Sequence, residues 1–296
     1  MPAGPSDPPA LVPNSVRAVA VSPVADWIPQ LQGLCVEDDV NFGDVLTKKK
    51  DNILRIGFTN IGGLPTSSLK PKDDLLWQGI NAMELDICGL AKLNTDRHLM
   101  KEDDRLYSRT QGWWESIHLS FDHNRCILPL EKWQWGGVAL IKRKKTVHRV
   151  ISKGVDPKRL GRWCWRRYRG RNNHTLRIFS CYCPNLPSRP LSTYTQQCSA
   201  MLTQGDERCP RIAFVEDLGD DIKQAQLDGD LLVVMVDGNM NMRESPMATM
   251  LVAYNLKEAI LSKHGINCPA TCRRNQSRIP IASGLQMIWA SRPAGT

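Results

Sequence analysis

The sequence predicts one α/β domain in which β-sheets are covered by helices. A strand–helix–strand pattern begins near Asp51, a β-rich region lies between Trp113 and Tyr182, and helical patterns flank an apolar strand that ends at Asp237. Hydrophobic periodicity separates the two kinds of element, because a half-buried strand repeats about every two residues and a surface helix about every 3.6. With 296 residues, 42% of them hydrophobic, the chain can bury a full core.

Residues 53–90 are predicted to form a strand, a helix and a second strand. Residues 53–59 (ILRIGFT) and 86–90 (DICGL) are short apolar runs, which are typical of strands. Residues 69–85 between them carry apolar side chains at helical spacing, namely Leu75, Leu76, Ile80 and Met83.

The β-rich region holds five short runs separated by Gly, Pro, Asn and basic residues. We expect these runs to pair as an antiparallel portion of sheet. They are residues 113–121, 136–142, 146–152, 162–168 and 175–182.

Helical patterns return after this region. They cover residues 191–202 and 211–227, and a further one at 247–262, which contains Glu258, follows the strand at 231–236.

Residues 1–50 are predicted to be a Pro-rich, poorly ordered leader to a domain at residues 51–296. Seven of the nineteen prolines fall within the first 29 residues, and three consecutive lysines end the segment. Such a composition buries too little apolar surface to offset the entropy of ordering the chain.

The run VVMVDGNMN places Asp237 and Asn239 directly after a buried strand, where side chains are delivered to a cleft. Aspartate can bind a divalent cation or orient water, and the Asn two positions on can offer an amide to a phosphate oxygen. The alternative is a Gly–Asn turn that only closes the strand.

Four further stretches occur in a characteristic order before this run: FTNIGGLP (58–65), DICGLAKLNTD (86–96), QWGGVALIK (134–142) and IFSCYCPN (178–185). Together the five resemble the endonuclease/exonuclease/phosphatase superfamily, and more closely its retrotransposon-encoded endonuclease branch, over about residues 51–291. The resemblance implies a DNase I-like, four-layer α/β (α+β) fold: a two-sheet β-sandwich flanked by helices. It also implies Mg²⁺-dependent cleavage of phosphodiesters.

The resemblance also assigns roles to residues. Asn60 matches the family's asparagine near the metal and phosphate, and Tyr182 matches its phosphate-side tyrosine. Asp237 matches the water-orienting or metal-linked aspartate, and Asn239 the phosphate-contacting asparagine. Because each follows a predicted strand, we expect these four residues and Lys92 to converge at one rim of the sandwich.

The chain departs from the family at three expected elements. Lys92 stands where the family has its metal-binding Glu, Ala282 stands in place of the acid on the C-terminal strand, and the final Asp–His pair is absent. Asp237 is then the one metal ligand implied, with Mg²⁺ as cofactor if the domain is active and none otherwise. Lys92 can pair with Asp237 or donate to a bound phosphate, and we favour the ion pair.

The positive charge is concentrated in one segment. The chain carries a net +9, whereas residues 142–177 hold fourteen Lys or Arg and one acid, Asp156, which leaves the remainder at −4. Trp163, Trp165 and Tyr168 lie within the segment and could stack on bases while arginines meet phosphates. The alternative is a solvated edge strand that its charges protect from aggregation. The predicted nucleic-acid-binding residues are Lys142, Arg143, Arg166, Arg167, Arg169 and Arg171.

The location and partners follow from what the sequence lacks. No apolar run approaches the about 18 residues that span a bilayer, and the N-terminus lacks a secretory signal pattern. We therefore expect an intracellular protein, nuclear or cytoplasmic, with no membrane partner. Cys88, Cys126, Cys164 and Cys181 are expected to be buried thiols rather than disulfides.

Taken together, the residues predict an endonuclease-like domain of doubtful activity that binds nucleic acid, DNA in preference to RNA, in an oligomeric state that the sequence does not define. A nucleic-acid-binding pseudoenzyme and a decayed mobile-element fragment without activity remain as alternatives.

Overall fold

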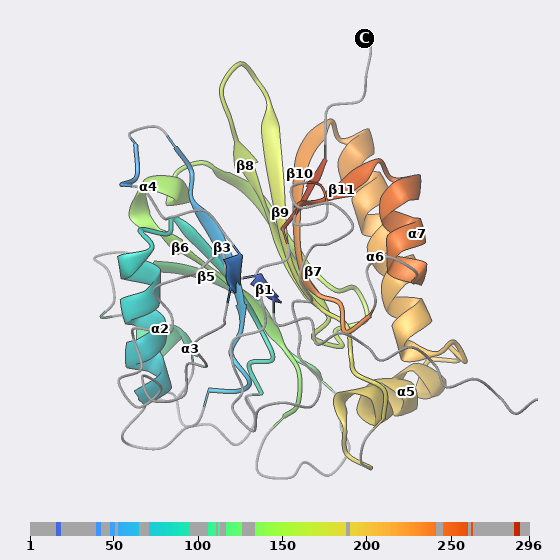
Figure 1. The fold of residues 1–296 in the computed structure, drawn as a ribbon. Coiled ribbons are helices and arrows are strands. Elements are labelled where there is room, and N and C mark those ends of the chain that lie inside the picture. The colour runs from blue at the N-terminus through green and yellow to red at the C-terminus, as the bar shows by residue number, and fades with distance from the viewer. Residues whose placement is uncertain are drawn as a thin grey trace, which may run out of the picture.

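The two-sheet architecture is visible in a computed structural model of the chain (Figure 1). The structure describes residues 16–18, 40–42, 48–50, 53–64, 71–94, 106–110, 112, 117–125, 134–187, 190–240, 245–259, 262 and 287–290. The two larger sheets pack face to face, and helices cover their outer faces (Figure 1).

The first sheet has four strands in the order β3-β4-β6-β5. They are β3 (Ile56–Asn60), β4 (Ile87–Ala91), β6 (Val138–Arg143) and β5 (Ile117–Asp122). β3 and β4 run parallel, and β6 is antiparallel to both β4 and β5. The crossover between the parallel strands is α2 (Pro71–Ala82), which lies on the outer face of this sheet, and a short α3 (Leu106–Thr110) follows β4 (Figure 1).

The second sheet has the order β11-β12-β10-β9-β8-β7. Its antiparallel part is β7 (Val150–Val155), β8 (Trp163–Arg169) and β9 (Thr175–Tyr182). β10 (Asp230–Asp237) runs parallel to β9, and the crossover between them contains α5 (Thr193–Thr203) and α6 (Pro210–Leu227).

The remaining elements of this sheet come from the end of the chain. α7 (Pro246–Ala253) packs beside α6, and β11 (Leu256–Glu258) forms the edge strand. β12 (Met287–Ala290) lies between β10 and β11 and is antiparallel to both.

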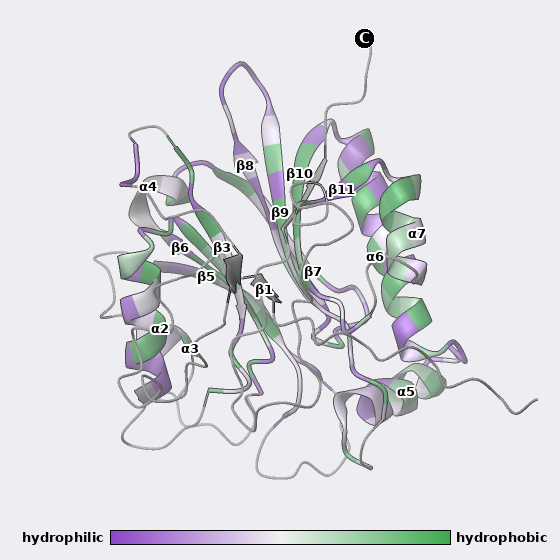
Figure 2. Cartoon of the chain, viewed as in Figure 1, coloured by the Kyte–Doolittle hydropathy of each residue, from purple (hydrophilic) through white to green (hydrophobic). Residues whose placement is uncertain are grey.

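Three apolar layers hold the domain together, and Figure 2 shows hydrophobic residues concentrated on the strands and on one side of each long helix. One layer fills the space between the sheets and includes Phe58, Ile178 and Met235. A second lies between the second sheet and the helices α6 and α7, and a third lies between the first sheet and α2. The predicted two-sheet sandwich flanked by helices is therefore confirmed.

Two predictions about elements were wrong in part. The β-rich region does not form one sheet, because β5 and β6 pair in the first sheet and β7, β8 and β9 in the second. The short helix α4 (Lys144–Val147) separates the two groups. The helix expected at residues 247–262 ends at Ala253, since Asn255 takes a left-handed conformation with φ 52°. Glu258 lies in the strand β11.

The predicted leader is described only in part. β1 (Val16–Ala18) and β2 (Val40–Phe42) pair as a parallel two-stranded sheet, and most other residues of the segment 1–50 lie outside the described ranges. Lys49 contacts the domain, because its ammonium pairs with the carboxylate of Asp86. A boundary between leader and domain at residue 50 stays a prediction.

The two sheets approach each other closely at Gly89 of β4. A Cβ atom at this position would lie 2.6 Å from Met235 Cε and 2.9 Å from Phe58 Cδ2. Both neighbours are buried in the layer between the sheets, so they have little room to move.

We expect Gly89→Ala to lower the free energy of unfolding by about 1–3 kcal/mol, because overpacking a filled core strains side chains and backbone. Denaturant unfolding followed by tryptophan fluorescence measures the change. Gly112→Ala is the matched control, since a Cβ there meets nothing within 4 Å. Equal losses in the two variants would contradict tight packing between the sheets at Gly89.

Candidate functional site

The carboxyl ends of four strands meet at one rim of the sandwich. β3 and β4 are parallel with Asn60 opposite Ala91, and β9 and β10 are parallel with Tyr182 opposite Asp237. The Asn60 side chain bonds to Asp237 across the two sheets, which shows that both pairs end on the same side of the molecule. The local sequence explains this position, because the strands bury apolar residues and carry Asn60, Tyr182 and Asp237 at their last positions.

Asp237 lies at the centre of this rim. Asn60 Nδ2 donates a hydrogen bond of 2.7 Å to Asp237 Oδ2, and Lys92 Nζ lies 3.8 Å from the same oxygen. The Lys92 ammonium also sits 5.4 Å from the centroid of the Tyr182 ring, within the range of a cation–π contact. The structure thus brings Asn60, Lys92, Tyr182 and Asp237 together, and the ion pair between Lys92 and Asp237 is present.

The conformation of the segment after β4 directs Lys92 to this position. Lys92 has a left-handed backbone with φ 54°, and its carbonyl accepts a 2.7 Å hydrogen bond from Gly63 N. The residues after β3 and those after β4 therefore hold each other in place, with Asn60 Oδ1 accepting from Gly62 N at 3.0 Å.

Burial governs the ionisation of the rim. Removal from water raises the pKa of Asp237, while Lys92 and the hydrogen bonds from Asn60 and Asn239 act in the opposite direction. Burial also raises the pKa of Tyr182, and the nearby Asp237 charge adds to that effect. Tyr182 is therefore a neutral phenol, and Asp237 depends on its neighbours to stay charged.

Asn239 belongs to the same rim, and its hydrogen bonds hold the neighbouring loops in place. Its Nδ2 donates a 2.7 Å hydrogen bond to the carbonyl of Cys183, and its own carbonyl accepts 2.8 Å from an Arg211 terminal nitrogen on α6. Asn239 takes a left-handed φ of 46°, which Asn tolerates better than most residues. The loops after β9 and β10 are joined through this side chain.

The described part of the rim does not fit Mg²⁺. Magnesium prefers near-octahedral oxygen ligands with carboxylates among them, and Asp237 is the one carboxylate that the described residues place here, with an ammonium beside it. No group of three or more His, Cys, Asp or Glu suited to a metal ion occurs in the described ranges. Ala282, in the segment expected to supply a further acid, lies outside those ranges.

A second polar cluster at the same end was not predicted from the sequence. Arg162 is fully buried and makes two 2.7 Å hydrogen bonds to Asp156 and one of 2.9 Å to Asp217 on α6. Burial and the nearby Asp156 charge raise the pKa of Asp122 to about 7. The signal in the sequence was Asp156, the single acid within the basic segment.

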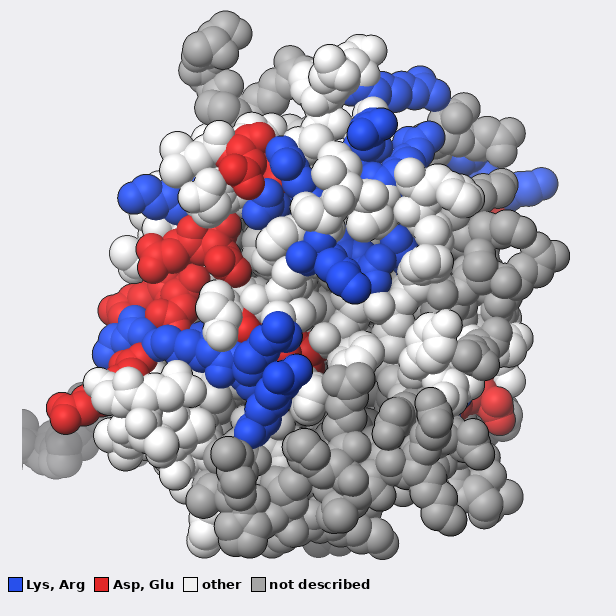
Figure 3. All heavy atoms as spheres, turned by 180° about the vertical axis from the view of Figure 1, so that it is seen from behind, with Lys and Arg blue, Asp and Glu red and all other residues white. Residues whose placement is uncertain are grey.

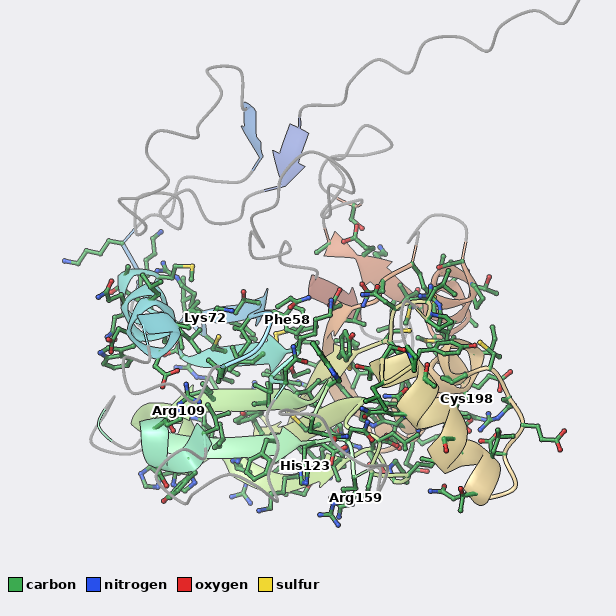
Figure 4. The ribbon with its side chains drawn as sticks, turned by 90° about the horizontal axis from the view of Figure 1, so that it is seen from below. Phe58, Lys72, Arg109, His123, Arg159 and Cys198 are labelled. Carbon is green, nitrogen blue, oxygen red and sulfur yellow. The ribbon has the colours of Figure 1, made fainter. Side chains whose placement is uncertain are left out.

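This second cluster lies to one side of the rim. In the view onto this end, His123 and Arg159 come from neighbouring segments, away from Phe58 (Figure 4). The backbone connects the two segments, because Arg125 N donates to Arg159 O at 3.1 Å.

The structure corrects the prediction for the basic segment. Lys142 and Arg166 are buried, with exposed fractions of 1% and 4%, so they are not part of an open nucleic-acid-binding surface. Trp163 and Tyr168 are buried as well and cannot stack on bases there. The pattern of residues in strands explains this outcome, because alternate side chains of β8 point into the sandwich.

Other arginines of the segment form salt bridges with acidic residues that are distant in sequence. Arg167 Nε donates 2.7 Å to Asp230, and Arg177 pairs with both Asp228 and Asp230. Arg169 and Arg171, beside the β8–β9 turn, are exposed, and no described residue pairs with them through a salt bridge. The Arg143 side chain lies outside the described part.

Charge is distributed unevenly on the surface. On the face opposite to that of Figure 1, most acidic side chains gather towards the left edge, and Lys and Arg form patches across the upper and central part (Figure 3). Among the side chains of residues 142–177 that the structure describes, the exposed Lys and Arg are Arg149, Lys153, Arg159, Arg169 and Arg171. The described part of the segment therefore has an accessible basic surface, formed by fewer Lys and Arg side chains than the sequence predicts.

Three of the four cysteines that were predicted to be buried lie within the described residues. Cys88, Cys164 and Cys181 are free and buried, as predicted, and Cys126 lies outside the described ranges. Among the helices that the structure describes, none has the length and apolar composition needed to cross a membrane.

Comparisons with known proteins identify the fold. Neither a protein-family model nor a curated protein sequence matches the chain. Among solved structures, the APE2 catalytic domain of Xenopus laevis is 15% identical with a TM-score of 0.52, and the match covers 79% of this chain and 81% of that one.

Two more solved structures have similar scores. The 3′ phosphatase NExo from Neisseria, bound to a product DNA hairpin, is 14% identical with a TM-score of 0.51, covering 80% of this chain and 87% of that one. An AP endonuclease from Archaeoglobus fulgidus is 11% identical with a TM-score of 0.50, covering 80% and 86%. The chain has the fold of the endonuclease/exonuclease/phosphatase superfamily.

Proposed function

We propose that this chain is an endonuclease-like domain that binds nucleic acid and shows little or no Mg²⁺-dependent cleavage. The observation that carries the proposal is the Lys92 ammonium, 3.8 Å from Asp237 Oδ2. It occupies the place where the family resemblance puts a metal-binding carboxylate.

Electrostatics explains why a lysine in place of a carboxylate disfavours a metal ion at this rim. Two unit charges about 4 Å apart attract by about 4 kcal/mol in an effective dielectric of about 20, before the cost of desolvation is subtracted. A divalent cation at Asp237 would have to displace the ammonium and then share the rim with it. Loss of the metal's charge stabilisation lowers a phosphodiesterase rate by several orders of magnitude.

The same groups can hold a phosphate without cleaving it. Lys92 offers an ammonium, Asn60 an amide, and the neutral Tyr182 phenol a hydroxyl, all at the ends of rigid strands. A phosphate oxygen that draws Lys92 away from Asp237 would leave a buried carboxylate with a raised pKa. Weak binding without turnover is the expected result at this rim.

DNA is the proposed partner. NExo was solved with a DNA hairpin, which supports binding of DNA by this fold. Arg169 and Arg171 would meet phosphates away from the rim, since both are exposed. The order of the five sequence stretches supports descent from the retrotransposon-encoded branch.

We expect Arg169→Ala with Arg171→Ala to weaken binding to duplex DNA and to reduce the slope of log K against log salt by up to about 2, because two phosphate contacts release fewer counterions. Fluorescence anisotropy at several salt concentrations measures both quantities. Lys223→Ala with Lys257→Ala removes the same charge from exposed positions elsewhere. Equal slopes for the two double variants would exclude the β8–β9 turn from the interface.

The purified protein should not nick plasmid DNA in Mg²⁺ above the level of Asp237→Ala, and Lys92→Glu alone should not restore full activity. One regained carboxylate rebuilds a metal ligand, whereas the described residues that act on Asp237 include no histidine to transfer a proton. A plasmid-nicking assay with and without EDTA tests this. Robust nicking that both EDTA and Asp237→Ala abolish would show that the wild-type rim is an active nuclease.

Lys92→Glu also has a predicted effect on stability. Without divalent cations, two neighbouring carboxylates should lower the free energy of unfolding by about 1–3 kcal/mol. Mg²⁺ should recover part of that loss in the variant and leave the wild type unchanged, because ligands stabilise the state that binds them. Thermal unfolding with Mg²⁺ and with EDTA compares the two proteins, and Lys92→Met controls for loss of the ammonium alone. A wild-type protein that Mg²⁺ stabilises as strongly as Lys92→Glu would contradict the blocked metal position.

A further inference from the structure

A cavity of about 450 Å³ lies at the other end of the sandwich from the Asp237 rim. Its walls come from β5 and β6 of the first sheet, from β7 and β8 of the second, and from the short helices α3 and α4. The strand registers place it, because Lys142 lies opposite Ile87 at the start of β4, whereas Val138 lies opposite Ala91 at the rim. The cavity is therefore separate from the site described above.

The lining carries positive charge and no carboxylate. Four of the residues around the cavity are basic, namely His118, Lys142, Lys153 and Arg166, and the others are polar or apolar and uncharged. Lys142 and Arg166 are almost wholly buried. Lys153 is exposed, so that one cation lies at the mouth while two lie deeper.

The two buried cations lack the partners that such groups normally require. Within the described residues, Arg166 Nε donates to Ser120 Oγ and neither terminal nitrogen of Arg166 has an acceptor. The Lys142 ammonium lies 5.7 Å from the Tyr168 ring centroid and has no described carboxylate within salt-bridge distance. A buried charge without compensation is costly, and an anion is the usual remedy.

The rest of the protein shows how this chain handles other buried arginines. Arg162 pairs with Asp156, Arg177 with Asp230, and Arg109 with Asp73. Compensation by an acidic side chain is thus the rule among these residues. Among the described residues, the pair Lys142 and Arg166 departs from this rule, and both line the cavity.

Mutual repulsion among the cavity cations supports the same conclusion. Burial lowers the pKa of Lys142 to about 7, and the Arg166 and Lys153 charges add to this. Burial also lowers the pKa of His118, with contributions from Lys142, Arg166, His148 and Lys153. A bound anion would relieve this repulsion and favour the protonated ammonium.

We propose that the cavity is a binding site for a phosphate-class dianion, held by the Lys142 ammonium and the free terminal nitrogens of Arg166. A guanidinium presents two parallel donors to a tetrahedral oxyanion, and the ammonium supplies a point charge from the adjacent strand. Lys153 at the mouth attracts the ligand. The apolar residues Val150 and Ile151 leave room for the uncharged part of a phosphomonoester.

Sodium sulfate is the probe, compared with sodium chloride at equal ionic strength. Wild-type protein should show a saturable rise in melting temperature with sulfate, and isothermal titration calorimetry should resolve one site that binds sulfate more tightly than the rim does. Lys142→Met should lose at least tenfold in sulfate affinity, and Lys153→Met several-fold. Lys223→Met, at an exposed position on α6, should bind as wild type does.

Stability in chloride separates binding from misfolding. Because Lys142→Met removes an uncompensated buried cation, the variant should be at least as stable as the wild type without sulfate. The proposal is overturned by equal sulfate responses in all four proteins. The exposed Lys153→Met keeps the test valid if a buried substitution fails to fold.

The pH dependence gives a second readout. Sulfate stays dianionic between pH 6 and 9, so any change of charge comes from the protein. The titratable and charged side chains around the site are Tyr107, His118, Lys142, His148, Lys153, Arg166 and Tyr168. Burial lowers the pKa of Lys142 to about 7 when no anion is bound, and a bound anion favours the protonated ammonium. The sulfate affinity of the wild type should therefore be highest below pH about 7 and fall as the pH rises above it. In Lys142→Met this decline should be weaker, and an identical decline would assign it to the histidines and count against the proposal.

Three ligands then separate the sources of the dianion. Inorganic phosphate, a 5′-phosphorylated oligonucleotide and its unphosphorylated counterpart are compared for competition with sulfate. Competition by phosphate alone indicates a small-molecule site, and stronger competition by the phosphorylated oligonucleotide than by its counterpart indicates a nucleic-acid end. Absence of competition by any of the three overturns the assignment. Lys142→Met should lose this competition, which distinguishes the cavity from an oxyanion bound at the Asp237 rim.

Discussion

Face-to-face packing of two sheets at the level of Gly89 is the constraint on which the rest of the domain depends. Only a residue without a side chain lets Met235 and Phe58 fill the space beside β4. Ser180 Oγ donates across the same interface to Leu90 O, which fixes one sheet relative to the other along the strands. With that relation set, the parallel pairs β3–β4 and β9–β10 both end at the Asp237 rim.

The rim could be predicted from the sequence because it depends on local features. A buried strand that stops at a polar residue identifies both the strand and the position of the residue at its end, as for Asn60 and Asp237. The order of such strand ends then identified the fold. The strand β11 could not be predicted in this way. An apolar residue such as Leu256 suits a helix as well as a strand, and only pairing with β12 makes this segment a strand.

Buried charge was the feature that the sequence did not reveal. A run of basic residues predicts a solvated or nucleic-acid-binding surface, yet the compensating acids lie far away along the chain: Arg167 and Arg177 meet Asp230 of β10. Long-range pairing of this kind leaves no local pattern. Lys142 and Arg166 show the converse, since nothing in the sequence distinguishes a paired cation from one that faces a cavity.

The position of β12 has a consequence for how the chain assembles. β12 inserts between β10 and β11, although it is the last strand that the structure describes along the chain. Until residues 287–290 emerge during synthesis, Val233, Val234 and Met235 present an unpaired β10 edge next to an apolar layer. Exposed edges of this kind recruit other strands. The nascent domain therefore passes through a stage at which intermolecular pairing competes with its own completion, and a molecular chaperone would have the β10 edge as a target.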